Sequence, residues 1–136
     1  MFRIFFFFFL TLPLHSEEVL HFYSSAPLSL EKNQLRDLYL GRILDVDKVT
    51  VRPVVLPTGA SHKALLKEVV FKTASQFKRH WKKMLFTGKA SPPAEFDSEK
   101  GVFELLRSKN EEKGIWFFCS FRKEKPDGVF EVEVGK

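Results

Sequence analysis

The sequence has few of the residues that would support a crosslinked or catalytic protein. Its 136 residues include one cysteine, Cys119, so an intrachain disulfide is excluded. The four histidines are scattered, and neither a Gly-x-Ser-x-Gly elbow nor a nucleotide-binding glycine loop is present. Asp45 and Asp47 have no further ligands nearby, which favours a solvated turn over a metal site. We therefore predict that the protein is not an enzyme and has no catalytic residue, metal or cofactor.

The N-terminal residues have the pattern of a secretory signal peptide. Arg3 gives a basic start, residues 4–14 form an apolar run, and the sequence then turns acidic. The run is too short for a transmembrane helix, which needs about 20 apolar residues. Five consecutive phenylalanines within it leave no polar face, which argues against a buried strand. We predict a signal peptide at 1–16 cleaved near Ser16, a mature domain at 17–136 without an integral membrane segment, and a periplasmic or secreted location.

The mature chain carries a mild positive charge. Only Arg3 among the 22 basic residues lies before residue 17, so 21 basic and 17 acidic residues remain and the net charge is near +4. The strongest basic run is Lys78–Lys83, and helical spacing places its cations on an outer, solvated face. An anionic lipid or an acidic envelope protein suits such a face in an exported protein, and we predict no nucleic-acid binding.

Hydrophobic periodicity and turn residues predict strands that alternate with helices. Strands are expected at 19–23, 50–56, 115–121 and 129–134, with Cys119 as a small core residue in the third of them. Helices are expected between Ser29 and Gly41, at 61–71, at 74–86, and from Asp97 or Ser98 to about residue 108. This order indicates a single α/β domain with a mixed sheet and about four helices.

Particular residues define the ends and edges of these elements. Ser29 and Thr73 are the expected N-caps of the first and third helices, and Gly41 is the expected stop of the first. Pro53 should place its strand at a sheet edge or a bulge, because proline has no N–H to donate to a neighbouring strand. The segment 89–96 contains two adjacent prolines and is expected to be an extended loop.

The turn that starts at Pro57 leads a strand into the N-terminus of a helix, where backbone N–H groups can bind an anion. Gly59 allows a ligand to approach the backbone closely. We predict an anion site made by the backbone N–H groups of Gly59, Ala60 and Ser61, assisted by the side chains of Ser61 and His62. The same residues also suit an ordinary capped connection, which remains the alternative.

Several segments share a pattern with a known family. They are the helix end Leu35–Ile43 (LRDLYLGRI), the strand Val51–Leu56, the turn at Gly59 and Ser61, Trp81 with Phe86–Gly88, and Gly114 with Ile115. Over roughly residues 28–118 the chain resembles the small single-lobe proteins related to the phosphate-binding proteins of ABC transporters. In the family turn Arg-x-Asp-Gly-Ser-Gly-Thr only Gly59 matches outright, with Leu56 at the arginine position and Ala60 at the first hydroxyl.

The resemblance implies a periplasmic-binding-protein type 2 fold, of which this chain would be one α/β lobe. It further implies a non-enzymatic binding module for an oxyanion such as phosphate, with an ABC permease as partner. Because no arginine stands at the turn, a strong source of phosphate affinity is missing. The alternative function is a periplasmic interaction or accessory protein that binds an envelope protein and no small molecule.

Overall fold

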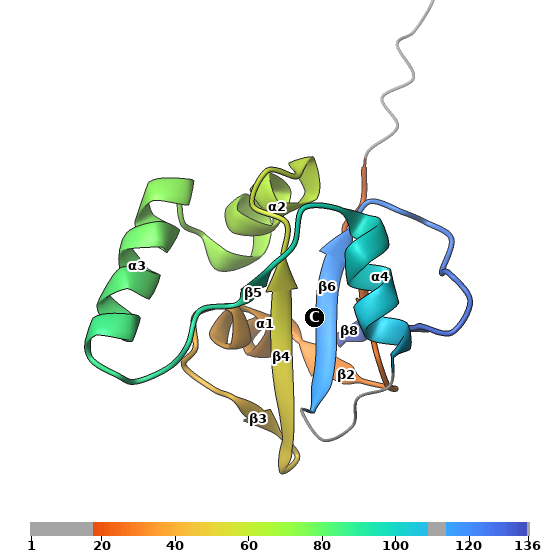
Figure 1. Ribbon diagram of the computed structural model, residues 1–136, viewed down its shortest axis with the longest axis horizontal. Helices are drawn as coiled ribbons and strands as arrows, with labels where there is room; N and C mark the ends of the chain where they lie inside the picture. The colour runs from red at the N-terminus through yellow and green to blue at the C-terminus, as the bar shows by residue number, and fades with distance from the viewer. Residues whose placement is uncertain (1–17, 109–113, 136) are drawn as a thin grey trace, which may run out of the picture.

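A six-stranded mixed sheet lies at the centre of the computed structural model, which describes residues 18–108 and 114–135 (Figure 1). The predicted signal peptide, residues 1–16, lies outside the described residues. The strands are β1 His21–Ser24, β2 Ser29–Glu31, β3 Asp45–Val46, β4 Val49–Val55, β5 Ala94–Glu95, β6 Ile115–Ser120, β7 Phe130–Glu131 and β8 Glu133–Gly135. The helices are α1 Lys32–Tyr39, α2 Ala60–Leu65, α3 Ala74–Phe86 and α4 Glu99–Arg107, with a π-helical turn, η1 Leu66–Val70, directly after α2.

The sheet combines parallel and antiparallel pairs. Its strand order is β3-β4-β6-β1-β7, and β5 also pairs with β4. β4 runs parallel to β5 and β6, whereas the β3–β4, β1–β6 and β1–β7 pairs are antiparallel. β2 and β8 form a separate two-stranded parallel sheet. The predicted α/β class, with a mixed sheet and about four helices, is confirmed for the described residues.

The core has one cluster of buried side chains on each face of the sheet. Because side chains alternate along a strand, Phe117 and Cys119 of β6 join the cluster with α1, α2, η1 and α3. Phe118, between them, joins the cluster with α4. Cys119 is buried, as predicted. The central strands therefore contribute buried side chains to both clusters.

The first and third helices differ in how well their N-caps could be predicted. α3 has the predicted bounds, and Thr73 Oγ1 accepts a hydrogen bond from the Gln76 N–H at 3.1 Å. The predicted cap at Ser29 is wrong because Ser29 is in β2, paired with β8. Glu31 is the N-cap residue of α1, and its N–H donates to the Gln34 side chain at 2.9 Å.

Three further predictions need correction. The helix expected at 61–71 is α-helical only to Leu65, and it ends at Phe71 in the left-handed conformation with φ of 57°. The strand expected at 129–134 is two strands. The first, β7, pairs with β1, and the Val132 N–H still donates to the Phe22 carbonyl of β1 at 2.8 Å. After Val132 the chain leaves the main sheet, and β8 pairs with β2. The expected loop 89–96 contains β5.

The position of Pro53 also differs from the prediction. β4 is not an edge strand, because β6 lies on one side and both β3 and β5 pair along the other. β3 pairs with Val49 and Thr50, and β5 pairs with Val54 and Val55. Pro53 lies between these paired stretches and pairs with neither β3 nor β5. Its missing N–H therefore costs no hydrogen bond to either strand.

Candidate functional site

The predicted anion turn begins α2, and part of it is enclosed. Gly59 is the N-cap residue, with φ −81° and ψ 147°, and its N–H already donates to the Leu56 carbonyl at 2.9 Å. Ala60 is exposed, whereas Ser61 and His62 are only 6% and 8% exposed. The structure thus places Gly59, Ala60, Ser61 and His62 in one turn, but it gives the Ser61 and His62 side chains little outward surface. Whether the turn binds an anion stays a prediction.

His62 packs against α3. Its ring meets Phe77 edge-on, with ring centroids 5.8 Å apart. Among the described residues no group hydrogen-bonds its buried Nδ1 atom. Burial lowers the pKa of His62, and the nearby Glu95 carboxylate opposes this only in part. The imidazole is therefore neutral at pH 7.

A groove of about 470 Å³, which we call the α3 groove, lies beside His62. Its apolar lining includes Pro57, Phe77, Trp81, Leu85, Pro92 and Pro93. Its charged lining consists of Lys78, Lys82 and Glu95. The groove therefore joins the end of β4, the start of α2, one side of α3 and the two-proline segment, which are far apart in the sequence.

Two ring hydrogen bonds orient α3. Trp81 Nε1 donates to the Tyr39 carbonyl at 3.0 Å, and His80 Nε2 lies 2.7 Å from the Leu40 carbonyl. Carbonyls at the end of a helix such as α1 lack intrahelical partners, so these bonds satisfy groups that would otherwise need water. With the helix held in this way, Lys78 and Lys82 border the α3 groove, while Arg79 and Lys83 are exposed and do not line it.

A second hollow, of about 410 Å³, adjoins the α3 groove. The two share Trp81, Pro92 and Pro93, and the second hollow extends along β4 to Arg52 and Trp116. Arg52 lies over the Trp116 ring, with its guanidinium carbon 5.6 Å from the ring centroid. The second hollow therefore widens the apolar surface around the two-proline segment.

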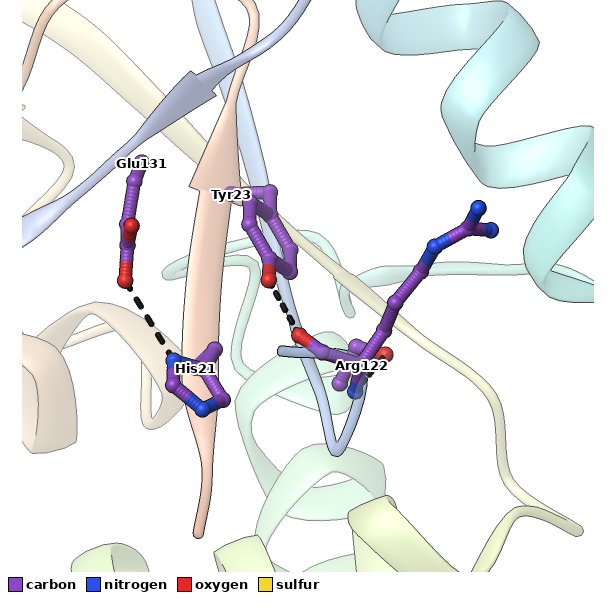
Figure 2. A network of polar contacts seen from close by, with 5 residues as sticks. His21, Tyr23, Arg122 and Glu131 are labelled. Carbon is purple, nitrogen blue, oxygen red and sulfur yellow. Dashed lines mark hydrogen bonds and ion pairs between the residues drawn. The ribbon is translucent and has the colours of Figure 1, made fainter. Parts of the chain in front are cut away.

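A separate polar network joins β1 to its neighbours (Figure 2). His21 Nδ1 lies 3.3 Å from the Glu131 carboxylate, and the Tyr23 hydroxyl donates to the Arg122 carbonyl. Figure 2 shows the Arg122 guanidinium pointing away from Tyr23. The buried Ser120 hydroxyl donates to the Glu99 carboxylate at 2.6 Å, which ties β6 to the start of α4. These contacts fasten strands to one another and to α4, so we assign the network a structural role.

Sequence reasoning found the wall of α3 but not the groove. Phe77 and Trp81 lie at helical spacing on one side of α3, and both are buried. Leu85 follows the same spacing from Trp81, but it is 60% exposed and lines the α3 groove. Pro92 and Pro93 form the wall of the α3 groove that faces α3. Adjacent prolines are stiff and cannot continue a helix, so they were the one feature of the sequence that could have indicated this wall.

In the described part of the chain, no helix combines the length and apolarity needed to cross a membrane, and no three His, Cys, Asp or Glu side chains are grouped to hold a metal ion. No family model matches the chain, and no curated protein or solved structure gives a significant match.

Proposed function

We propose that the protein is an exported, non-enzymatic binding module, a single periplasmic-binding-protein type 2 lobe, that holds a small amphiphilic anion in the α3 groove. The observation that carries this proposal is the groove itself. Ligand pockets in proteins are commonly about 300–1,000 Å³, mostly apolar, with a few polar groups that orient the ligand. A volume of about 470 Å³ with an apolar lining and two lysines fits that description.

The lining has an apolar part and a charged part, which suit the body and the head group of an amphiphilic ligand. An apolar body would pack on Phe77 and the two prolines, where it removes apolar surface from water. An oxyanion head group, such as a phosphate, would lie near Lys78 and Lys82, whose ammonium groups act as point charges. The predicted anion turn adjoins this groove, because Pro57 and His62 both line it. The resemblance supports an ABC permease as the partner that receives the ligand.

Calorimetry on a chain of residues 17–136 tests this function with octyl phosphate and inorganic phosphate. This chain keeps every described helix and strand. We expect octyl phosphate to bind at least tenfold more tightly, because burying two methylene groups contributes about 1.6 kcal/mol. Lys78→Gln/Lys82→Gln should weaken octyl phosphate binding. Arg79→Gln/Lys83→Gln removes the same charge from residues outside the groove and should leave binding within about twofold.

Two outcomes would reject the groove as the binding site. One is the absence of heat with millimolar octyl phosphate. The other is equal weakening by the two double variants, since a response to net charge alone would not involve the groove.

The alternative, an interaction protein without a small-molecule ligand, rests on the burial of the Ser61 and His62 side chains. A turn of this kind would serve only to connect β4 to α2. Under this alternative, reversing the charge of Lys78, Lys82 and Lys83 should abolish co-purification of an envelope protein, while octyl phosphate should give no heat with the unmodified chain.

A further inference from the structure

The excess of positive over negative charge in this protein comes from one segment. Residues 69–94 contain six lysines and arginines and no acidic residue, with Glu68 and Glu95 at the two borders. The rest of the chain has 16 basic and 17 acidic residues and is close to neutral. The net charge of +5 therefore resides on α3 and the residues next to it.

Part of this charge surrounds an exposed aromatic ring. Arg79, Lys83, Phe86 and Lys89 form what we call the α3 basic face, and all four are exposed. Phe86 is 91% exposed at the last residue of α3. Neither of the two ion pairs found among the described residues includes a cation of this face. α3 itself lies at the outer edge of the molecule in Figure 1.

We propose that the α3 basic face docks on an anionic lipid bilayer. Phe86 would insert into the boundary between head groups and acyl chains, where an aromatic side chain leaves water. Arg79, Lys83 and Lys89 would lie against the anionic head groups, each strengthening the attraction. A large exposed aromatic ring beside exposed cations has both parts that interfacial binding needs.

The surroundings of α3 favour lipid over nucleic acid. Binding of single strands uses several aromatic rings on which bases stack. Of the other rings of α3, Phe77 is buried, and His80 and Trp81 are held at the Leu40 and Tyr39 carbonyls. Phe86 alone offers an exposed ring on α3, which suits insertion better than stacking of successive bases.

This inference is independent of the proposed function. The α3 groove is bordered by Lys78 and Lys82, whereas the α3 basic face uses residues that do not line the groove. Ligand binding in the α3 groove and lipid binding by the α3 basic face can therefore each be disproved without affecting the other.

Co-sedimentation with vesicles tests the inference on a chain of residues 17–136. We expect binding to vesicles of phosphatidylglycerol and phosphatidylcholine in equal parts, little binding to phosphatidylcholine alone, and release by high salt. Phe86→Ser should reduce the partition coefficient about tenfold without unfolding the protein, because Phe86 is almost fully exposed. Arg79→Gln/Lys83→Gln should reduce it by roughly 25-fold, at about fivefold for each cation.

A matched control separates the α3 basic face from net charge. Lys100→Gln/Lys123→Gln removes two exposed cations elsewhere and should leave the partition coefficient within about threefold. The proposal is overturned if mixed vesicles do not bind, if Phe86→Ser binds as well as the unmodified chain, or if the two double variants lose binding equally. Binding of a single-stranded oligonucleotide that is as strong as vesicle binding and unaffected by Phe86→Ser would assign the face to polyanions in general and would also overturn it.

Discussion

His62 shows how one buried side chain couples the candidate site to the stability of the fold. Its ring is packed on Phe77, and its Nδ1 atom is enclosed without a hydrogen-bond partner among the described residues. Protonation would place a charge in this enclosed position, and burial accordingly lowers the pKa of His62 in the folded protein. In the unfolded chain the imidazole has its ordinary pKa of about 6.5.

This difference predicts that His62 makes the fold sensitive to mild acid. Below pH 6.5 the unfolded chain binds a proton at this position and the folded chain does not, so the free energy of unfolding falls as the pH drops from about 6.5 toward the folded pKa. His62→Leu removes the titrating group. Denaturant unfolding at pH 7.5, 6.5 and 5.5 should show a smaller loss of stability in His62→Leu than in the unmodified protein, and parallel losses in the two proteins would contradict the assignment.

Helix ends supply a comparison at the scale of single elements. Gly41 follows α1 and Gly88 follows α3, and both have positive φ, of 69° and 70°. The N–H of Gly41 donates to Leu38 and that of Gly88 to Leu85, as is common where a helix ends in a left-handed residue. The two differ in surroundings, because a Cβ at Gly41 would lie 2.5 Å from the Trp81 ring, whereas nothing lies within 4 Å of one at Gly88.

The two glycines should therefore respond differently to the same substitution. Gly88→Ala should lower the free energy of unfolding by about 1 kcal/mol, the cost of the left-handed conformation alone. Gly41→Ala adds overpacking against Trp81, for a further 1–3 kcal/mol or so. Chemical denaturation of both variants measures the difference, and equal costs would show that Trp81 moves aside freely.

Elements could be predicted from the sequence where local contacts define them. α3 has its predicted bounds because Thr73 and Gln76, three residues apart, cap each other. Ser29 was mistaken for a cap because its pairing with Glu133 joins residues far apart in the sequence, which no local pattern reveals. The π-helical turn after Leu65 likewise follows from no capping residue or turn motif in the sequence.

At the scale of the whole molecule, the class of fold followed from the alternation of strands and helices, but the site did not. Gly59 and Ala60 are at the helix start where the sequence placed them. Both Ser61 and His62 are buried by contacts with other elements: the Ser61 carbonyl accepts a hydrogen bond from Cys119 Sγ of β6, and the His62 ring packs on Phe77 of α3. The position of α3 in turn depends on its ring bonds to the Tyr39 and Leu40 carbonyls. Such tertiary contacts decide which side chains of a predicted turn remain available.

The two core clusters should unfold as one unit, because β1, β4 and β6 contribute side chains to both. Leu38 of α1 is buried on one face of the sheet and Leu106 of α4 on the other. Truncating either to alanine should cost about 2–5 kcal/mol. Each variant should still unfold in a single transition, since neither face can keep its packing without the shared strands.

Urea titrations followed by far-UV circular dichroism and by tryptophan fluorescence test this coupling. Leu44→Ala is the matched control, because Leu44 is 52% exposed and its truncation should change stability by less than about 1 kcal/mol. For Leu38→Ala and Leu106→Ala the two probes should give coincident midpoints, both shifted to lower urea. A second transition in only one variant would mean that the faces unfold separately, and the strands common to both clusters would then not transmit stability across the sheet.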